Sequence, residues 1–458
     1  MKPIFYAFFS TLFLLTLRAH GQEATESDLQ NLSLTECVAV ALENAEQIKN
    51  ARLDNQTAKA NVGEVRAAGL PQVNANVSLS DNFKVPKAFL PGEVVGGEPG
   101  TFVPVEFQPQ YAGQMGVSLN QLIFDGSYFL GLKAATVYTD LSRKAVRQSE
   151  IQVAEAVTKA YYGVLVTRER LRLIAKNEER IAQLHKETKA LYENGFAEKI
   201  DADRVKVSLN NLRTQKANLE RTVELSMGLL KFQMGLQPTD AISITGDIRE
   251  LALEVPPPIE DPTTAFQNRV EYSIMQTQRE LDKLNIKNYQ VRYLPSLSAS
   301  FSYGSNTGTN TFGDVWNFSN NWFGNGSIGL QLNIPIFDGL RKKYQVEAAR
   351  FALQQTENNM SQFERNVTLQ VSQGYLTLQN AVESLESQQE NMELAQEVFR
   401  VATIKYKEGV GSNLEVLDAE TAYNEAETNY YAALYDALIA KTDLQKAQGT
   451  LLTDLTEE

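Results

Sequence analysis

Short stretches of this chain alternate strictly between apolar and small polar residues. The clearest are residues 73–79, 297–303 and 328–336, and residues 115–124 alternate less regularly. A period of two is typical of a β-strand, because successive side chains point to opposite faces. Each stretch is about ten residues long, the length of a tilted transmembrane strand. The polar positions carry hardly any charge, which favours this interpretation over a half-buried strand of a soluble sandwich.

Two long segments have a different period. In residues 127–193, apolar side chains recur every three or four positions, as at Val157, Tyr161 and Val164, which is typical of a coiled-coil helix. Residues 340–407 have a similar pattern. Neither segment contains a proline, which would break a helix interior. At 1.5 Å per residue each helix would be roughly 100 Å long, so we expect a mainly α-helical molecule with a small β part.

The chain also repeats itself. Residues 116–126 match residues 329–339, and the tetrapeptide that ends at Gly195 matches the one that ends at Gly409. Anchors in the same order indicate two structural repeats, each with a helix, two strands, a very long helix, a glycine turn and another helix. We expect a first repeat at 22–236, a Pro-rich linker at 237–262, a second repeat at 263–450 and a C-terminal tail at 451–458.

The number of strands predicts an oligomer. Two strands per repeat make four per chain, whereas the smallest single-chain membrane barrels need about eight. An open sheet edge in lipid would leave backbone N–H and C=O groups unpaired. If these strands span a membrane, several copies of the chain must therefore share one barrel.

The N-terminus has the pattern of a secretory signal peptide, expected at 1–21. Lys2 precedes an apolar run that ends at Leu17, and small residues lead to a cleavage site before Gln22. The run is too short for an anchoring helix. Cys37 is the only cysteine, so no disulfide forms within the chain, and we expect it to pack as a small hydrophobic residue.

The composition argues against chemistry by the chain itself. Its formal net charge of −13 disfavours nucleic acid as a partner, because phosphates require basic surface. After signal cleavage His185 is the only histidine, and no soft-ligand metal cluster or Gly-rich phosphate loop is apparent. We expect no enzyme activity, no metal and no cofactor.

Three features together carry a resemblance to a known family. Phe-Asp-Gly follows the second strand of each half at 124–126 and 337–339, and Leu-Pro precedes the first strand at 70–71 and 294–295. Residues 406–419 read YKEGVGSNLEVLDA. From about residue 32 to residue 449 the chain resembles the TolC-like outer-membrane efflux proteins.

The resemblance implies a homotrimer in which about twelve strands form one β-barrel in the lipid of a Gram-negative outer membrane. An α-helical tunnel would continue the barrel into the periplasm, where an adaptor protein and an inner-membrane pump dock. The implied function is a passive exit channel of a tripartite efflux or secretion system, gated at its periplasmic end. The alternative is a soluble periplasmic coiled-coil scaffold or adaptor, which would lack the duplicated alternating strands.

Within the resemblance, two turns are expected to contact the adaptor. They contain Gly195 with Phe196 and Gly409 with Val410. As ordinary structural features these glycines would be helix C-caps, which is compatible with docking.

The resemblance also assigns residues to the tunnel entrance. Asp201, Glu415 and Asp418 match acidic positions that line it, and Tyr406 matches a tyrosine that helps to tie it shut. Gly411 stands where the best-known member has an arginine in that tie, so the arginine contact does not transfer. The alternative for the acidic residues is a solvated helix face.

The spacing of Glu415 and Asp418 carries a hypothesis of its own. Residues three apart share one face of a helix. A position in the first turn favours a carboxylate at Glu415, but Asp418 lies beyond that turn and Arg204 is its equivalent in the first half. Repeated around a trimer, the two would form rings of negative charge, which select cations in pores. We expect a cation-selective entrance that multivalent cations plug.

Overall fold

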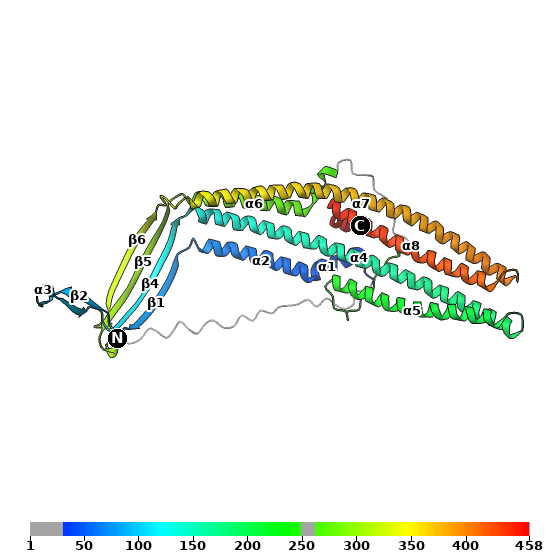
Figure 1. Cartoon of the computed structure of the whole chain (residues 1–458), viewed down its shortest axis with the longest axis horizontal. Coiled ribbons are helices and arrows are strands. Elements are labelled where there is room, and N and C mark those ends of the chain that lie inside the picture. Colours follow the sequence, from blue (N-terminus) through cyan, green and yellow to red (C-terminus); the bar gives the residue numbers. More distant parts are fainter. Residues whose placement is uncertain (1–30, 249–261, 458) are drawn as a thin grey trace.

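The computed structural model describes residues 31–248 and 262–457. They form an elongated molecule with a β-sheet at one end and paired helices over the rest (Figure 1). The predicted signal peptide and half of the predicted linker lie outside the described residues. The helices are α1 Leu34–Asn44, α2 Glu46–Ala67, α3 Gly92–Val95, α4 Gly126–Glu193, α5 Lys199–Gln233, α6 Val270–Val291, α7 Arg341–Lys407, α8 Asn413–Gln448 and α9 Leu451–Glu457.

The two predicted long helices are confirmed, since α4 has 68 residues and α7 has 67. The aspartate of each Phe-Asp-Gly motif lies where a long helix begins. The carboxylate of Asp125 accepts a hydrogen bond from the backbone N–H of Ser127 at 2.6 Å. The carboxylate of Asp338 accepts one from Lys342 N–H at 3.2 Å. The motif is thus duplicated because it satisfies the free N–H groups at two equivalent helix starts.

The main sheet is antiparallel, with the strand order β1-β4-β5-β6. Its strands are β1 Gln72–Asp81, β4 Tyr111–Phe124, β5 Ser296–Thr309 and β6 Phe323–Asn333. Each repeat therefore supplies one neighbouring pair, as the sequence predicts. Among the described residues, β1 and β6 each pair on one side only, so the sheet has two open edges.

The register aligns the alternation of all four strands, so that the sheet has one apolar and one uncharged polar face. One polar row consists of Asn74, Ser118, Ser302 and Ser327. The adjacent row on the other face consists of Val73, Leu119, Phe301 and Ile328. The side chains of Val73 and Ile328 are largely exposed in the single chain, and that of Phe301 is 44% exposed.

The prediction for the last strand was wrong at its end. The alternation continues to Ile336, but β6 ends at Asn333. Pro335 has no backbone N–H, so the strand cannot continue its hydrogen bonds there. The loops at the outer end of the sheet also contain elements that the alternation did not predict. These are the hairpin β2 Lys87–Pro91 and β3 Phe102–Glu106, with α3 between them, and the 3-10 turn η3 Phe312–Trp316.

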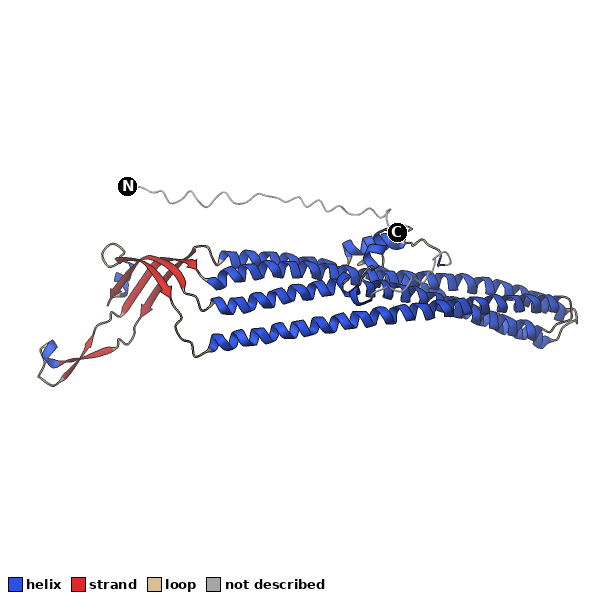
Figure 2. Ribbon diagram, turned by 90° about the horizontal axis from the view of Figure 1, so that it is seen from above, coloured by secondary structure: helices blue, strands red, loops and turns tan. Residues whose placement is uncertain are grey.

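The helices extend from the sheet to the opposite end of the molecule (Figure 2). The largest hydrophobic core forms where α1, α9, the end of α5 and the second half of α8 pack around α4. Cys37 is fully buried in it, which confirms its expected role as a small hydrophobic residue. Burial raises the pKa of the Cys37 thiol to about 12. A further short helix, η2 Pro262–Asn268, precedes α6 at the start of the second repeat. Within residues 31–248 and 262–457, the helices lack the combination of length and apolar character needed to cross a bilayer.

Candidate functional site

The far end of the molecule consists of two equivalent helical hairpins, α4/α5 and α7/α8. Gly195 has a φ of 78° and Gly409 a φ of 76°, a left-handed conformation that favours glycine. In the first turn, Phe196 N–H donates to the Leu191 carbonyl at 2.8 Å. In the second, Val410 N–H donates to the Lys405 carbonyl at 3.0 Å. This is the Schellman C-cap, so the capping role expected of both glycines is confirmed.

The same turns expose apolar side chains at the extreme tip. Phe196 is 81% exposed and Val410 is 76% exposed. The glycine at C′ places the next residue outside the helix, where none of the helices in the described part of the chain covers it. Exposed apolar groups at such a position are typical of contact surfaces.

Three contacts between the hairpins join the tips within one chain. The hydroxyl groups of Tyr406 and Thr188 lie 3.1 Å apart and link α7 to α4. The side-chain amide of Asn413 donates to the backbone carbonyl of Asp201 at 2.8 Å and links α8 to α5. The ammonium of Lys407 lies 4.0 Å from the carboxylate of Glu187. Tyr406 therefore contacts the other hairpin, and the chain makes these links without an arginine at Gly411.

A small hydrophobic core lies directly behind these contacts. It draws residues from all four helices of the tip, namely Ile181, Leu184, Val205, Leu209, Leu212, Ala402, Val416 and Ala419. Asn413 is 3% exposed, and its side-chain oxygen has no hydrogen-bond partner. The N-cap of α8 is Ser412, whose hydroxyl oxygen lies 3.2 Å from the backbone nitrogen of Glu415.

The predicted acidic residues do not form one cluster within the chain. Glu415 and Asp418 are both exposed on the first turns of α8. Asp201 lies in the first turn of α5, with its carboxylate 4.0 Å from the guanidinium of Arg204. The start of α8, which carries Glu415 and Asp418, contacts the start of α5 through the hydrogen bond from the Asn413 side chain to the Asp201 backbone carbonyl. Across the described residues, no group of three or more His, Cys, Asp or Glu side chains is arranged to hold a metal.

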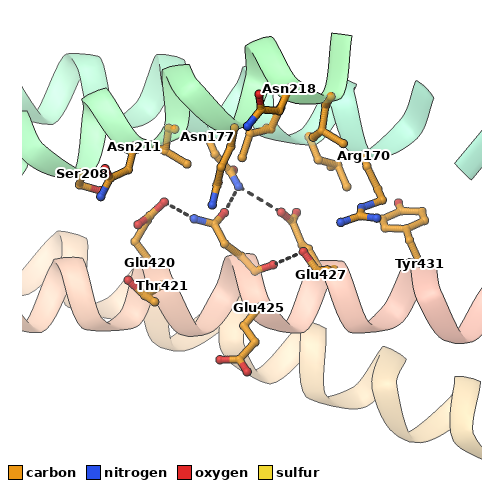
Figure 3. Close-up of a pocket in the computed structure, with 17 residues that line it drawn as sticks. Arg170, Asn177, Ser208, Asn211, Asn218, Glu420, Thr421, Glu425, Glu427 and Tyr431 are labelled. Atoms are coloured by element: carbon orange, nitrogen blue, oxygen red, sulfur yellow. Dashed lines mark hydrogen bonds between the residues drawn. The ribbon is translucent and has the colours of Figure 1, made fainter. Parts of the chain in front are cut away.

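A second polar group, which sequence analysis missed, lies farther from the tip between α4 and α8 (Figure 3). Asn177 is 2% exposed, Glu420 is 3% exposed and Glu427 is 5% exposed. The Asn177 amide donates to the Glu427 carboxylate at 3.2 Å and also bonds Asn424, whose own amide bonds Glu420. These side chains form the floor of a groove of about 600 Å³ that α5 borders.

Burial dominates the electrostatics of this group. It raises the pKa of Glu420 and of Glu427 above the usual glutamate range. Hydrogen bonds from Asn424 to Glu420 and from Tyr423 to Glu427, together with the nearby Arg180, only partly offset this effect. The Arg180 guanidinium lies over the rings of Phe399, at 5.4 Å, and Tyr423, at 5.3 Å.

The sequence did contain a signal for these residues. Val416, Glu420, Tyr423 and Glu427 recur at spacings of three and four, so the two glutamates occupy core positions of the helix stripe. In the same way Asn177 lies between Ile174 and Ile181 on the apolar stripe of α4. Polar residues at core positions of both helices are therefore a sequence signal that predicts a buried polar network.

A repeated pair of long helical hairpins attached to a short antiparallel sheet is the fold of outer-membrane channel subunits. CusC, whose crystal structures are described in terms of the conformational changes that accompany folding and transmembrane channel formation, superposes with a TM-score of 0.70 at 18% identity, over 91% of this chain and 92% of CusC.

The chain belongs to the outer membrane efflux protein family, because the model of that family matches residues 38–231 and 264–450. The probable efflux pump outer membrane protein TtgC of Pseudomonas putida is 24% identical over 346 residues, covering 74% of this chain and 69% of TtgC. The outer membrane protein TolC of Vibrio cholerae is 21% identical over 439 residues, covering 92% of this chain and 91% of TolC.

Family membership confirms several predictions. The chain is a channel component of the outer membrane that extends into the periplasm and serves a tripartite efflux or secretion system. The family is one of channels rather than enzymes. The alternative of a soluble periplasmic scaffold or adaptor is therefore wrong, because such a protein would not carry the duplicated strand pairs that this fold contains.

Proposed function

We propose that three copies of the chain form one exit channel, with a shared β-barrel in the outer membrane and an entrance at the helical tips. The observation that carries this proposal is the four-stranded sheet with two open edges, one apolar face and one uncharged polar face. Pairing β1 of one copy with β6 of the next would satisfy both edges. The apolar rows would then face lipid and the Ser/Asn rows would face the lumen.

Exposed apolar stripes on the helices support the same assembly. On α5 the residues Ile200, Val207, Leu225, Leu229 and Phe232 are all at least half exposed. Their spacing places them within about 60° of one another around the helix. On α7 a similar stripe contains Leu369, Leu376, Leu394, Val398 and Val401.

The apolar stripes on α5 and α7 also lie at the same distances from the tip. Leu229 lies 30 residues from the start of α5 at Lys199, and Leu376 lies 31 residues before the end of α7 at Lys407. Both are therefore about 45 Å from the tip. Val207 of α5 and Val398 of α7 both lie near the tip. On each helix, polar residues separate the apolar residues near the tip from those farther away. We propose that α5 of one copy packs on α7 of the next.

Val398→Glu is expected to weaken this association. Burying an unpaired carboxylate in place of an apolar contact should cost about 2 kcal/mol or more per interface. The measurement is the fraction of oligomer in detergent by size-exclusion chromatography with light scattering. Gln396→Glu is the matched control, because Gln396 is exposed two residues away on another face of α7. Equal assembly of both variants would show that this stripe is not an interface.

We further propose that the tips dock a periplasmic adaptor, which connects the channel to an inner-membrane pump. The exposed side chains of Phe196 and Val410 lie on equivalent Schellman turns, so a trimer would present six similar apolar points. TtgC is described as a component of an efflux pump, which supports a pump as the eventual partner.

Phe196→Asp combined with Val410→Asp is expected to leave a stable oligomer that neither transports nor cross-links to the adaptor. Both side chains are exposed, so the fold loses little, whereas loss of an interface hot spot costs at least about 2 kcal/mol. Glu408→Gln, at an exposed polar position in the second turn, is the control. Transport at the natural level in the double variant would contradict docking at these turns.

A further inference from the structure

Two buried glutamates of α8 face α4 at core positions. Glu420 and Glu427 lie 7 and 14 residues beyond the start of α8 at Asn413, which is about 10 and 21 Å from the tip. A buried carboxylate is costly unless it is paired or protonated. Each of these residues therefore needs a compensating contact with the opposite helix.

Those contacts form one continuous chain of hydrogen bonds across the helix pair. Glu420 bonds Asn424, Asn424 bonds Asn177 of α4, and Asn177 donates to Glu427 at 3.2 Å. Arg180 of α4 bonds the Asn177 side-chain oxygen. The side chain of Asn177 thus lies at the centre, where it joins both glutamates of one hairpin to the other hairpin (Figure 3).

The charges around the two glutamates do not balance. On α4, Arg180 is the guanidinium that acts on both carboxyls, and it is held between Phe399 of α7 and Tyr423 of α8. The Tyr423 hydroxyl also hydrogen-bonds the Glu427 carboxyl but carries no positive charge. Glu169 of α4 pairs with Arg172 and accepts from Tyr431.

The other groups that line the groove do not correct the imbalance. Arg170 of α4 and Glu425 of α8 border it with opposite charges, and the side chains that α5 contributes are uncharged. With both carboxyls ionised, two negative charges share the Arg180 cation. One protonated carboxyl would remove the excess charge and add a hydrogen-bond donor.

The position of the network allows protons to exchange. It forms the floor of the 600 Å³ groove between α5 and α8 rather than a closed core, so water can reach it. The network also lies between the two hydrophobic cores that join the hairpins. One is the small core behind Tyr406 at the tip, and the other is the large core around α4.

We propose that the Asn177–Asn424–Glu420–Glu427 network is a proton-dependent tie between the α4/α5 and α7/α8 hairpins. With one carboxyl protonated, the tie holds α8 against α4. With both ionised, their repulsion loosens it and the two tips separate more easily. The link to opening of the entrance rests on the proposed function, whereas the link between protonation and hairpin separation does not.

The direction with pH follows from the raised pKa of both carboxyls. A group whose pKa is higher in the closed structure stabilises that structure fully below its ordinary pKa, and the stabilisation is lost as the pH rises through the raised value. For these glutamates the ordinary value is 4.5. Separation of the hairpins should therefore increase as the pH rises above that value.

The test measures the distance between spin labels at the two tips. Glu198→Cys and Glu408→Cys place one label on each hairpin at exposed positions. The natural Cys37 can stay, because it is fully buried. In the full-length chain in detergent, we expect the distance distribution to shift to longer values between about pH 5 and about pH 8. An unchanged distribution would overturn the proposal.

Substitutions make the test specific. In the double variant Glu420→Gln/Glu427→Gln neither side chain can ionise, so the distance between the labels should stay short at every pH. In Asn177→Ala the tie is lost, so that distance should be long at every pH. Glu425→Gln, an exposed carboxyl on the same helix, should behave like the natural chain. If Glu425→Gln removed the pH dependence, or the double Gln variant retained it, the tie would not be the titrating element.

A second measurement separates this inference from the proposed function. Single-channel recordings should show open probability rising over the same pH range, and the double Gln variant should lose that rise. Label distances that respond to pH without any channel current would support the tie and contradict the channel entrance. Currents that respond to pH while the label distances do not would overturn the tie and leave the channel intact.

Discussion

Replacing both Glu415 and Asp418 with alanine is expected to abolish most of the cation selectivity of the channel and its block by multivalent cations. The two carboxylates are exposed on the same face of α8, within two turns of its start. In a trimer six charges would surround the axis at the narrow end. Removing a focused field of this kind should lower cation affinity about tenfold or more.

The structure indicates that these two substitutions leave the α7/α8 hairpin and its contacts in place. The backbone N–H of Glu415 is capped by Ser412, so helix α8 keeps its start without the Glu415 carboxylate. Neither acidic side chain takes part in the links from Tyr406 to Thr188 or from Asn413 to Asp201. A change in selectivity would therefore reflect lost charge rather than a displaced hairpin.

The measurement is the reversal potential and the cation block of single channels in planar bilayers. Glu408→Ala with Glu425→Ala removes the same number of exposed carboxylates from the α7/α8 hairpin and serves as the control. Anion selectivity in the natural channel would contradict the ring, as would an unchanged block in the double alanine variant. The two residues would then be a solvated helix face.

Ile328→Arg is expected to destabilise the assembled channel by about 2–4 kcal/mol, whereas Ser327→Arg should have little effect. Ile328 lies in the middle of β6 on the apolar face and is 85% exposed in the single chain. Ser327 is its neighbour on the uncharged polar face, where its hydroxyl lies 2.9 Å from that of Ser302. Only the first variant would place a guanidinium in lipid.

Resistance of the oligomer to heating in detergent gives the comparison, with intact oligomer separated from monomer on a gel. Both variants add the same side chain to adjacent positions of the same strand, so the depth along the strand is matched and the face that receives the guanidinium differs. Similar melting of the two would refute the assignment of one face to lipid and the other to the lumen.

Much of the fold follows from periodicity. Alternation over residues 73–79 and 297–303 is strong because one face of each strand is apolar throughout, and a period of two leaves no other regular structure. The long helices were equally clear, since a segment without proline and with apolar residues every three or four positions has few alternatives. The end of β6 was missed because the alternation of side chains continues past Pro335, where the backbone loses its donor.

Less of the candidate site than of the fold could be predicted from the sequence. The glycine turns were predicted because a left-handed C-cap requires particular residues within a few positions. The partners of Tyr406 and Asn413 lie more than 200 residues away, at Thr188 and Asp201. No local pattern specifies such pairs. The expectation of an acidic entrance placed Asp201 with Glu415 and Asp418, but within the chain Asp201 pairs with Arg204 instead.

The sequence by itself determined the four strands of the main sheet, the long helices and the capped turns, because each depends on a pattern of residues near one another in the chain, and the duplication is a property of the sequence itself. The tertiary structure alone decided which helix lies beside which, and so turned Glu420 and Glu427 from two acidic residues of a helix into a buried network with Asn177. Burial depends on what a distant segment covers. The energetic cost of those carboxylates, and hence their capacity to respond to protons, arises only once α4 packs against α8.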